Sequence, residues 1–159
     1  MNKSNKALFK LGIAIWLSKS MQESQFYQKI DELLEVCWKW VENHEVSADD
    51  LYSLLDDGTE FGGAFIYMQV DDSKYESRWN CIFEAGASIA SLAYECEGKD
   101  YKPALLEEID AEQEEFFSEQ LKTIIGNKIQ SLDHFKNYLS VGNKKNKEKI
   151  LEKLSEILD

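Results

Sequence analysis

The fold is decided by residues 74–96, which read KYESRWNCIFEAGASIASLAYEC. Polar positions recur there every three or four residues and would form one narrow stripe on a helix: Glu84, Ser88, Ser91 and Glu95. Nearly every other residue between Cys81 and Tyr94 is apolar or small. A helix with this pattern is buried on most sides. The sequence therefore predicts a central helix at 74–96, whose alanine and glycine positions let neighbouring helices approach closely.

Helical periodicity continues on both sides of this segment. Before the central helix, we expect helices at 4–20, at 24–43, from an N-cap at Ser47 to Gly58, and at 60–70. After it, we expect a helix at 103–125 with a bend near Asp110, a short helix capped by Ser131, and a final helix that extends through Leu158. Residues 60–70 also have strand propensity, but an isolated strand would leave its backbone unpaired. We therefore expect an all-α, single-domain bundle over 1–159, with about six to eight helices around the helix at 74–96.

The charge of the chain restricts its partners. The net charge is −12, from 30 Asp and Glu against 18 Lys and Arg, and Arg78 is the one arginine. Nucleic-acid-binding proteins neutralise phosphates with basic surfaces. The excess of acidic over basic residues therefore argues against nucleic acid and against anionic membranes as partners. It favours a basic protein, which an acidic surface attracts over a distance, although solubility alone is a second explanation.

The cysteines favour a reducing compartment. Cys81 and Cys96 would lie about 22 Å apart on one helix, and a disulfide needs Cα atoms within about 7 Å. Cys37 and Cys81 stand among apolar neighbours and are expected to be buried. The cytoplasm is therefore the expected location.

The amino end also permits a second interpretation. Three lysines precede the apolar run 11–17, which loosely resembles a secretory signal. However, this run is short and the helical pattern begins earlier, at Ala7. No segment reaches the roughly 20 apolar residues of a membrane span.

Motifs for catalysis, cofactors or zinc do not occur in the sequence, so no catalytic residue, metal or cofactor is expected. His44 and His134 have no acidic or histidine partner three or four residues away. One enzymatic alternative remains open. All-helical nucleotide pyrophosphohydrolases bind magnesium through two acidic pairs, and Glu32-x-x-Glu35 with Asp57-x-x-Glu60 imitates that arrangement.

Acidic residues gather in two clusters. The second, from Glu107 to Glu119, is expected to be the solvated face of a helix, partly balanced by C-terminal lysines. The first cluster lies in loops and at helix ends, with aromatic residues among its carboxylates. Aromatic side chains can anchor an interface while carboxylates set orientation and association rate. We therefore expect the partner-binding residues to be Asp49, Asp50, Tyr52, Asp56, Asp57, Glu60, Phe61, Tyr67, Asp71, Asp72 and Tyr75. Trp40 is a further candidate, with packing at the edge of the core as the favoured alternative.

The central segment 56–109 also carries a family resemblance. It reads DDGTEFGGAFIYMQVDDSKYESRWNCIFEAGASIASLAYECEGKDYKPALLEEI. This segment resembles the family catalogued as the sixth of the predicted immunity proteins in bacterial polymorphic toxin systems. The resemblance implies a protein without catalytic activity whose partner is a toxin, often a basic nuclease. It implies no particular binding residue.

These observations together predict an immunity protein. It would act as a stoichiometric inhibitor that blocks a basic toxin made by the same cell, by steric occlusion with electrostatic steering. Two alternatives stay open: a helical adaptor or homo-oligomer without inhibitory activity, and the magnesium-dependent pyrophosphohydrolase. The sequence leaves the oligomeric state undetermined.

Overall fold

Helices account for all the regular secondary structure in the described part of this computed structural model, which covers residues 1–111, 114–141 and 146–159. The expected all-α fold is confirmed. The α-helices and 3-10 helices (η) are α1 (Lys3–Ser18), η1 (Lys19–Met21), α2 (Tyr27–Asn43), α3 (Ala48–Leu55), α4 (Ala64–Val70), η2 (Ser73–Tyr75), α5 (Glu76–Cys96), α6 (Ala104–Ala111), α7 (Glu115–Ile125), η3 (Gly126–Ser131), α8 (Leu132–Ser140) and α9 (Lys147–Leu158).

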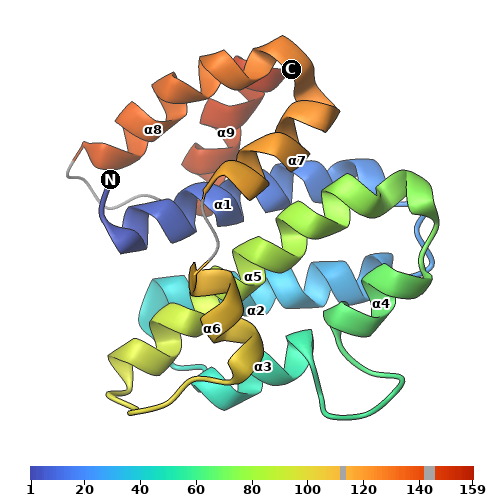
Figure 1. Cartoon of the computed structure of the whole chain (residues 1–159). Helices are drawn as coiled ribbons and strands as arrows, with labels where there is room; N and C mark the ends of the chain where they lie inside the picture. Colours follow the sequence, from blue (N-terminus) through green and yellow to red (C-terminus); the bar gives the residue numbers. More distant parts are fainter. Residues whose placement is uncertain (112–113, 142–145) are drawn as a thin grey trace.

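The central position of α5 is also confirmed. This helix runs through the middle of the molecule, with α7, α8 and α9 on one side and α3, α4 and α6 on the other (Figure 1). Gly86 lies in its middle. A Cβ atom there would stand 3.1 Å from Leu55 Cδ2 and 3.4 Å from Leu33 Cδ1. The glycine therefore allows α2 and α3 to pack directly against the backbone of α5.

The polar stripe of α5 is more deeply buried than an ordinary solvent-facing stripe. Glu84 and Ser91 are only 4% and 1% exposed. Lysines from other segments reach the stripe: Lys10 Nζ lies 3.4 Å from Glu84 Oε1, and Lys102 Nζ donates to Ser91 Oγ at 2.7 Å. Because a buried polar group is costly without a partner, these contacts explain how a helix with a polar stripe can occupy the centre.

Local signals predicted the boundary between α2 and α3. His44 ends α2 in the left-handed conformation, at φ 55°, and its ring stacks on Trp40 with centroids 4.1 Å apart. Trp40 is 5% exposed, so packing is its role. Ser47 caps α3 as expected, since its Oγ accepts from the backbone N–H of Asp50 at 3.1 Å.

Other boundaries differ from the prediction. Ser131 is not a helix cap: its backbone is already helical, at φ −69° and ψ −16°, because η3 continues directly into α8. α3 ends at Leu55 rather than at Gly58, since Asp56 is extended. Residues 60–70, for which the sequence also showed strand propensity, are helical from Ala64 to Val70. The segment expected as one helix over 103–125 with a bend near Asp110 is described as two helices, α6 ending at Ala111 and α7 beginning at Glu115, and residues 112–113 between them lie outside the described residues.

Cys37 and Cys81 are buried as expected, and burial raises the pKa of each thiol to about 12. Cys96 is exposed, and all three cysteines are free thiols. Among the described helices, none combines the length and hydropathy required to cross a bilayer.

Candidate functional site

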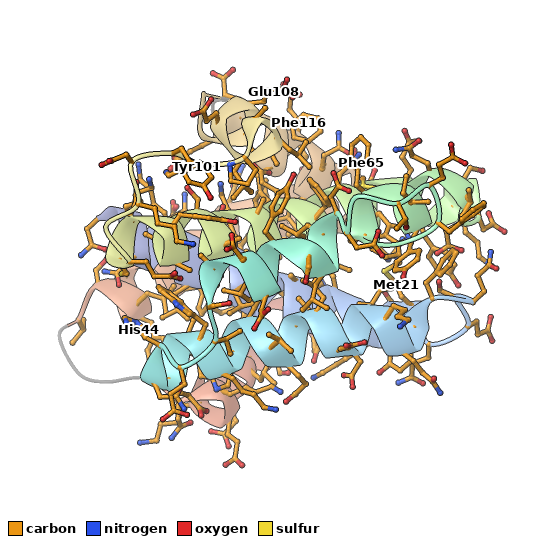
Figure 2. All side chains as sticks on the ribbon, turned by 90° about the horizontal axis from the view of Figure 1, so that it is seen from below. Met21, His44, Phe65, Tyr101, Glu108 and Phe116 are labelled. Carbon is orange, nitrogen blue, oxygen red and sulfur yellow. The ribbon has the colours of Figure 1, made fainter. Side chains whose placement is uncertain are left out.

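The candidate residues lie on one continuous segment that covers one side of α5. This segment consists of α3, the loop from Asp56 to Gly63, α4 and η2. Figure 2 shows the molecule from the side of α3, with Phe65 of α4 labelled. We call residues 56–63 the acidic loop, because Asp56, Asp57 and Glu60 lie in it.

The acidic loop is held by its own side chains. Asp57 Oδ1 accepts hydrogen bonds from the backbone N–H of Thr59 at 2.9 Å and from Thr59 Oγ1 at 2.6 Å, and these bonds lower the pKa of Asp57. Asp56 Oδ1 accepts from the N–H of Gly58 at 2.9 Å. The loop therefore has a defined conformation at its tip.

Two glycines close the base of the loop. Gly63 has φ +98°, and a Cβ atom there would lie 2.6 Å from the carbonyl oxygen of Leu55. A Cβ atom on Gly62 would overlap the Asp57 carboxylate, at 1.6 Å from Oδ2. Gly63 is thus required where the two ends of the loop approach each other, and Gly62 leaves room for the Asp57 carboxylate, neither of which the sequence alone indicated.

Phe61 projects from the acidic loop into solvent. It is 83% exposed, whereas Phe65 of α4 is 38% exposed and Val70 is 61% exposed. A largely exposed phenylalanine on a hydrogen-bonded loop leaves a large apolar surface unburied in the free protein. Phe65 and Val70 were not among the residues expected to bind a partner. The exposure of Val70 could have been expected from the helical pattern. Val70 stands two residues beyond Met68, and residues two positions apart point to opposite sides of a helix.

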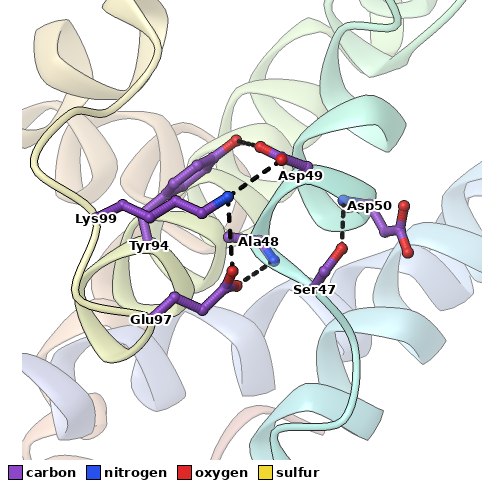
Figure 3. Close-up of polar contacts among 7 residues, drawn as sticks. All are labelled: Ser47, Ala48, Asp49, Asp50, Tyr94, Glu97 and Lys99. Carbon is purple, nitrogen blue, oxygen red and sulfur yellow. Dashed lines mark hydrogen bonds and ion pairs between the residues drawn. The ribbon is translucent and has the colours of Figure 1, made fainter.

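Asp49 is used to attach α3 to α5 (Figure 3). Its Oδ1 accepts from the hydroxyl of Tyr94 at 2.6 Å, and Lys99 Nζ lies 3.1 Å from its Oδ2. These two hydrogen bonds, from Tyr94 and then from Lys99, lower the pKa of Asp49. The neighbouring Glu97 accepts from the N–H of Ala48 at 2.6 Å. Asp49 is therefore a structural residue as well as an exposed carboxylate.

Asp71 also has a structural role. Its Oδ2 accepts from Ser24 Oγ at 2.6 Å and from Trp79 Nε1 at 2.8 Å, so it joins the turn before α2 to α5. Asp72 accepts from the N–H of Lys74 at 3.0 Å and begins η2.

The tyrosines of the candidate set are less accessible than expected. Tyr75 is 6% exposed, so the expectation that it is an exposed anchor is wrong. Tyr67 is half-buried and stacks on Phe26 with ring centroids 4.8 Å apart. Tyr52 is also half-buried, and burial followed by the charge of Asp56 raises its pKa. The members of the set that remain exposed without holding two helices together are Asp50, Asp57, Glu60, Phe61 and Asp72.

The four carboxylates of the magnesium alternative are not brought together. Glu35 pairs with Lys147 of α9, and Glu32 lies 3.8 Å from Lys29. Asp57 belongs to the acidic loop instead of a helix. In the parts of the chain that the structure describes, no three His, Cys, Asp or Glu side chains are grouped so that they could hold a metal ion.

One carboxylate of the second acidic cluster pairs with α1 rather than with the C-terminal lysines. Glu114 lies 3.0 Å from Lys6 of α1, and this hydrogen bond lowers its pKa. In the C-terminal helix, Lys147 pairs with Glu35 and Lys153 pairs with Glu156. Glu112, Lys144 and Lys145 lie outside the described residues.

Comparison with known proteins gives two findings. Residues 5–124 match the family model described as immunity protein Imm6. The chain is also 38% identical over 96 residues to the ferric uptake regulation proteins of Escherichia coli K12, Shigella flexneri and Klebsiella pneumoniae. This match covers 58% of the chain and 55%, 55% and 53% of these relatives, respectively, so the chain spans about half of their length. No solved structure matches.

Proposed function

This chain belongs to the immunity protein Imm6 family, and from that premise we propose that it is a stoichiometric inhibitor that binds and blocks a cognate basic bacterial toxin. The observation that carries the proposal is the family match over residues 5–124, which includes α3, the acidic loop and α4. The proposed mechanism is occlusion of the toxin without any chemical step.

The basic character of the toxin is inferred from charge. A chain with a net charge of −12 attracts a cationic partner and repels an anionic one. A nuclease is the toxin class that fits best, because it must present a basic surface to bind phosphates. An inhibitor with the opposite charge would compete directly for that surface.

The acidic loop is the proposed point of contact. Phe61 offers an aromatic anchor, and Asp57 and Glu60 provide carboxylates beside it. Aromatic anchors surrounded by polar residues carry much of the binding energy in protein interfaces. Because the loop is already held by Thr59 and closed by Gly63, little conformational entropy is lost on binding.

The proposed location is the cytoplasm of the toxin-producing cell. The three free thiols support it, since a reducing compartment keeps such residues unpaired.

The proposal places the gene of the cognate toxin next to the gene of this chain, and the test uses that toxin. We expect a one-to-one complex in which the toxin loses its activity, and Phe61→Ala should weaken binding by at least about tenfold because the anchor is removed. Surface plasmon resonance measures the affinity, and a toxin activity assay measures inhibition. The matched control is Phe116→Ala. Phe116 lies on α7, away from the acidic loop, and is 38% exposed.

Three results would contradict the proposal. Absence of a complex with the neighbouring toxin would reject the immunity role for that toxin. A complex that leaves the toxin fully active would favour the adaptor alternative. Equal affinity losses in the Phe61 and Phe116 variants would reject the acidic loop as the contact.

A further inference from the structure

A pocket lies where the ends of four helical elements meet. Its wall is formed by the end of α1, the first turn of α5, the junction of α7 with η3, and the end of α9. In Figure 1 the C-terminus lies beside the turn that follows α7. The cavity volume is about 460 Å³, within the range of small-molecule binding sites.

Three cationic side chains line this pocket: Lys19, Arg78 and Lys128. Arg78 Nε donates to Ser20 Oγ at 2.8 Å, and Lys128 Nζ donates to the carbonyl oxygen of Leu158 at 2.8 Å. These bonds fix the two cationic groups in place but do not neutralise them. Within the described residues, none of the three forms an ion pair with an acidic side chain.

The pocket is therefore positive in a strongly acidic protein. The acidic side chain in the lining is that of Asp159, whose Oδ1 accepts a hydrogen bond from Trp16 Nε1 at 3.0 Å. Three cations face this single side-chain carboxylate. Charge complementarity thus favours an anionic occupant.

Apart from Ser20, the rest of the lining is apolar. It includes the half-buried ring of Trp16 together with Ile124, Ile125 and Leu158. An aromatic face and branched aliphatic side chains suit a flat apolar group, whereas the planar guanidinium of Arg78 suits a carboxylate.

We infer that this pocket binds a carboxylate carried on an aromatic group. The aromatic ring lies against Trp16 and the isoleucines, and the carboxylate lies among Lys19, Arg78 and Lys128. Two sources supply this chemistry: a free aromatic acid, or the C-terminal aromatic residue of a polypeptide. The site is separate from the acidic loop, so it does not depend on the proposed toxin contact.

The first experiment compares two probes of the same shape, indole-3-acetate and indole-3-acetamide. Binding is followed through the indole N–H signal of Trp16 in ¹⁵N–¹H NMR spectra, which Trp16→Phe assigns. The acid should shift this signal saturably, and the amide should bind at least about tenfold more weakly, because it lacks the charge that the three cations recognise. Equal binding of the two probes, or binding of neither, would overturn the inference.

The second experiment changes the protein. Arg78→Gln and Lys128→Gln should each weaken indole-3-acetate binding by about tenfold. Lys39→Gln is the matched control, since Lys39 is exposed on α2 and does not line the pocket. Thermal melting confirms that the variants are folded, and wild-type affinity in both folded pocket variants would contradict the inference.

A third comparison identifies the source of the carboxylate. A short peptide ending in tryptophan is tested with a free and with an amidated C-terminus. Tighter binding of the free-acid peptide than of indole-3-acetate supports a polypeptide end as the natural occupant. Tighter binding of indole-3-acetate supports a small aromatic acid.

Discussion

At the scale of single residues, Asp49 shows how a surface carboxylate can be structural. It lies in the first turn of α3, where a negative charge also interacts favourably with the helix dipole. Its hydrogen bonds to Tyr94 and Lys99 connect α3 to α5 and to the segment that follows α5. The lowered pKa of Asp49 therefore makes stability depend on pH.

We expect Asp49→Asn to lower the melting temperature at pH 7. A depressed carboxyl pKa adds stability above its ordinary value of 3.8, and this stability is lost as the pH falls through the folded-state pKa. The difference between wild type and variant should therefore shrink toward pH 3. Melting curves by circular dichroism between pH 7 and pH 3 measure it.

Asp50→Asn is the control for this prediction. It removes a charge from the same helical turn and leaves both hydrogen bonds of Asp49 intact. A pH-dependent effect of equal size in both variants would show that the helix dipole, rather than the contacts with Tyr94 and Lys99, is responsible.

The closure of the acidic loop can also be tested at one residue. Gly63→Ala should destabilise the protein by about 2 kcal/mol or more, because φ is positive and the new Cβ would meet the backbone of Leu55. Gly58→Ala should cost about 1 kcal/mol, since φ is also positive there but the surrounding space is open. Urea denaturation compares the two variants. Equal losses would show that the close approach at Gly63 is not a real constraint.

At the scale of elements, α5 is the helix against which the others pack. Its small residues decide how closely α2 and α3 approach, and a Cβ atom on Gly86 would stand only 3.1 Å from Leu55 Cδ2. Its lysine contacts, from Lys10 of α1 and from Lys102 before α6, explain why a polar stripe is tolerated at the centre.

Substitutions at Gly86 should distinguish tight packing from helix propensity. Gly86→Ala should change the free energy of unfolding by less than about 1 kcal/mol, because higher helix propensity offsets contacts with the flexible ends of Leu55 and Leu33. Gly86→Leu should cost about 3 kcal/mol, because it forces these helices apart. Denaturant unfolding measures both. A neutral Gly86→Leu variant would contradict the packing of α2 and α3 on α5.

At the scale of the whole molecule, charge governs association with the proposed toxin. Exposed charges act over roughly a Debye length, about 10 Å at 0.1 M salt and much less at higher concentrations. A protein with a net charge of −12 should therefore bind a basic toxin by steered encounter.

We expect the association rate constant to fall at least about tenfold between 0.05 M and 0.5 M salt. Replacing the exposed Asp50 and Glu60 by Asn and Gln should reduce the rate at low salt. The control exchanges Glu148 and Glu152 of α9 for Gln, which gives the same change of net charge away from the acidic loop. Stopped-flow mixing measures these rates. A rate that does not change with salt would remove steering from the mechanism.

The sequence by itself determined the features that depend on local pattern. The central helix followed from the spacing of its polar residues, the end of α2 at Asn43 from helical periodicity, and the start of α3 from Ser47. These signals are local because a helix and its caps are formed by residues within a few positions of each other. Residues 56–109, which include the central helix, also carried the family resemblance, and the family match over residues 5–124 confirms it.

Only the tertiary structure decided which of the many acidic and aromatic residues are available to a partner. Asp49 is engaged by Tyr94 and Asp71 by Ser24, partners 45 and 47 positions away. Tyr75 is buried although its neighbours in sequence are polar. The cationic pocket joins Lys19, Arg78 and Lys128 from three distant segments. Burial and pairing depend on which helices pack together, and that information is absent from the spacing of residues along any one of them.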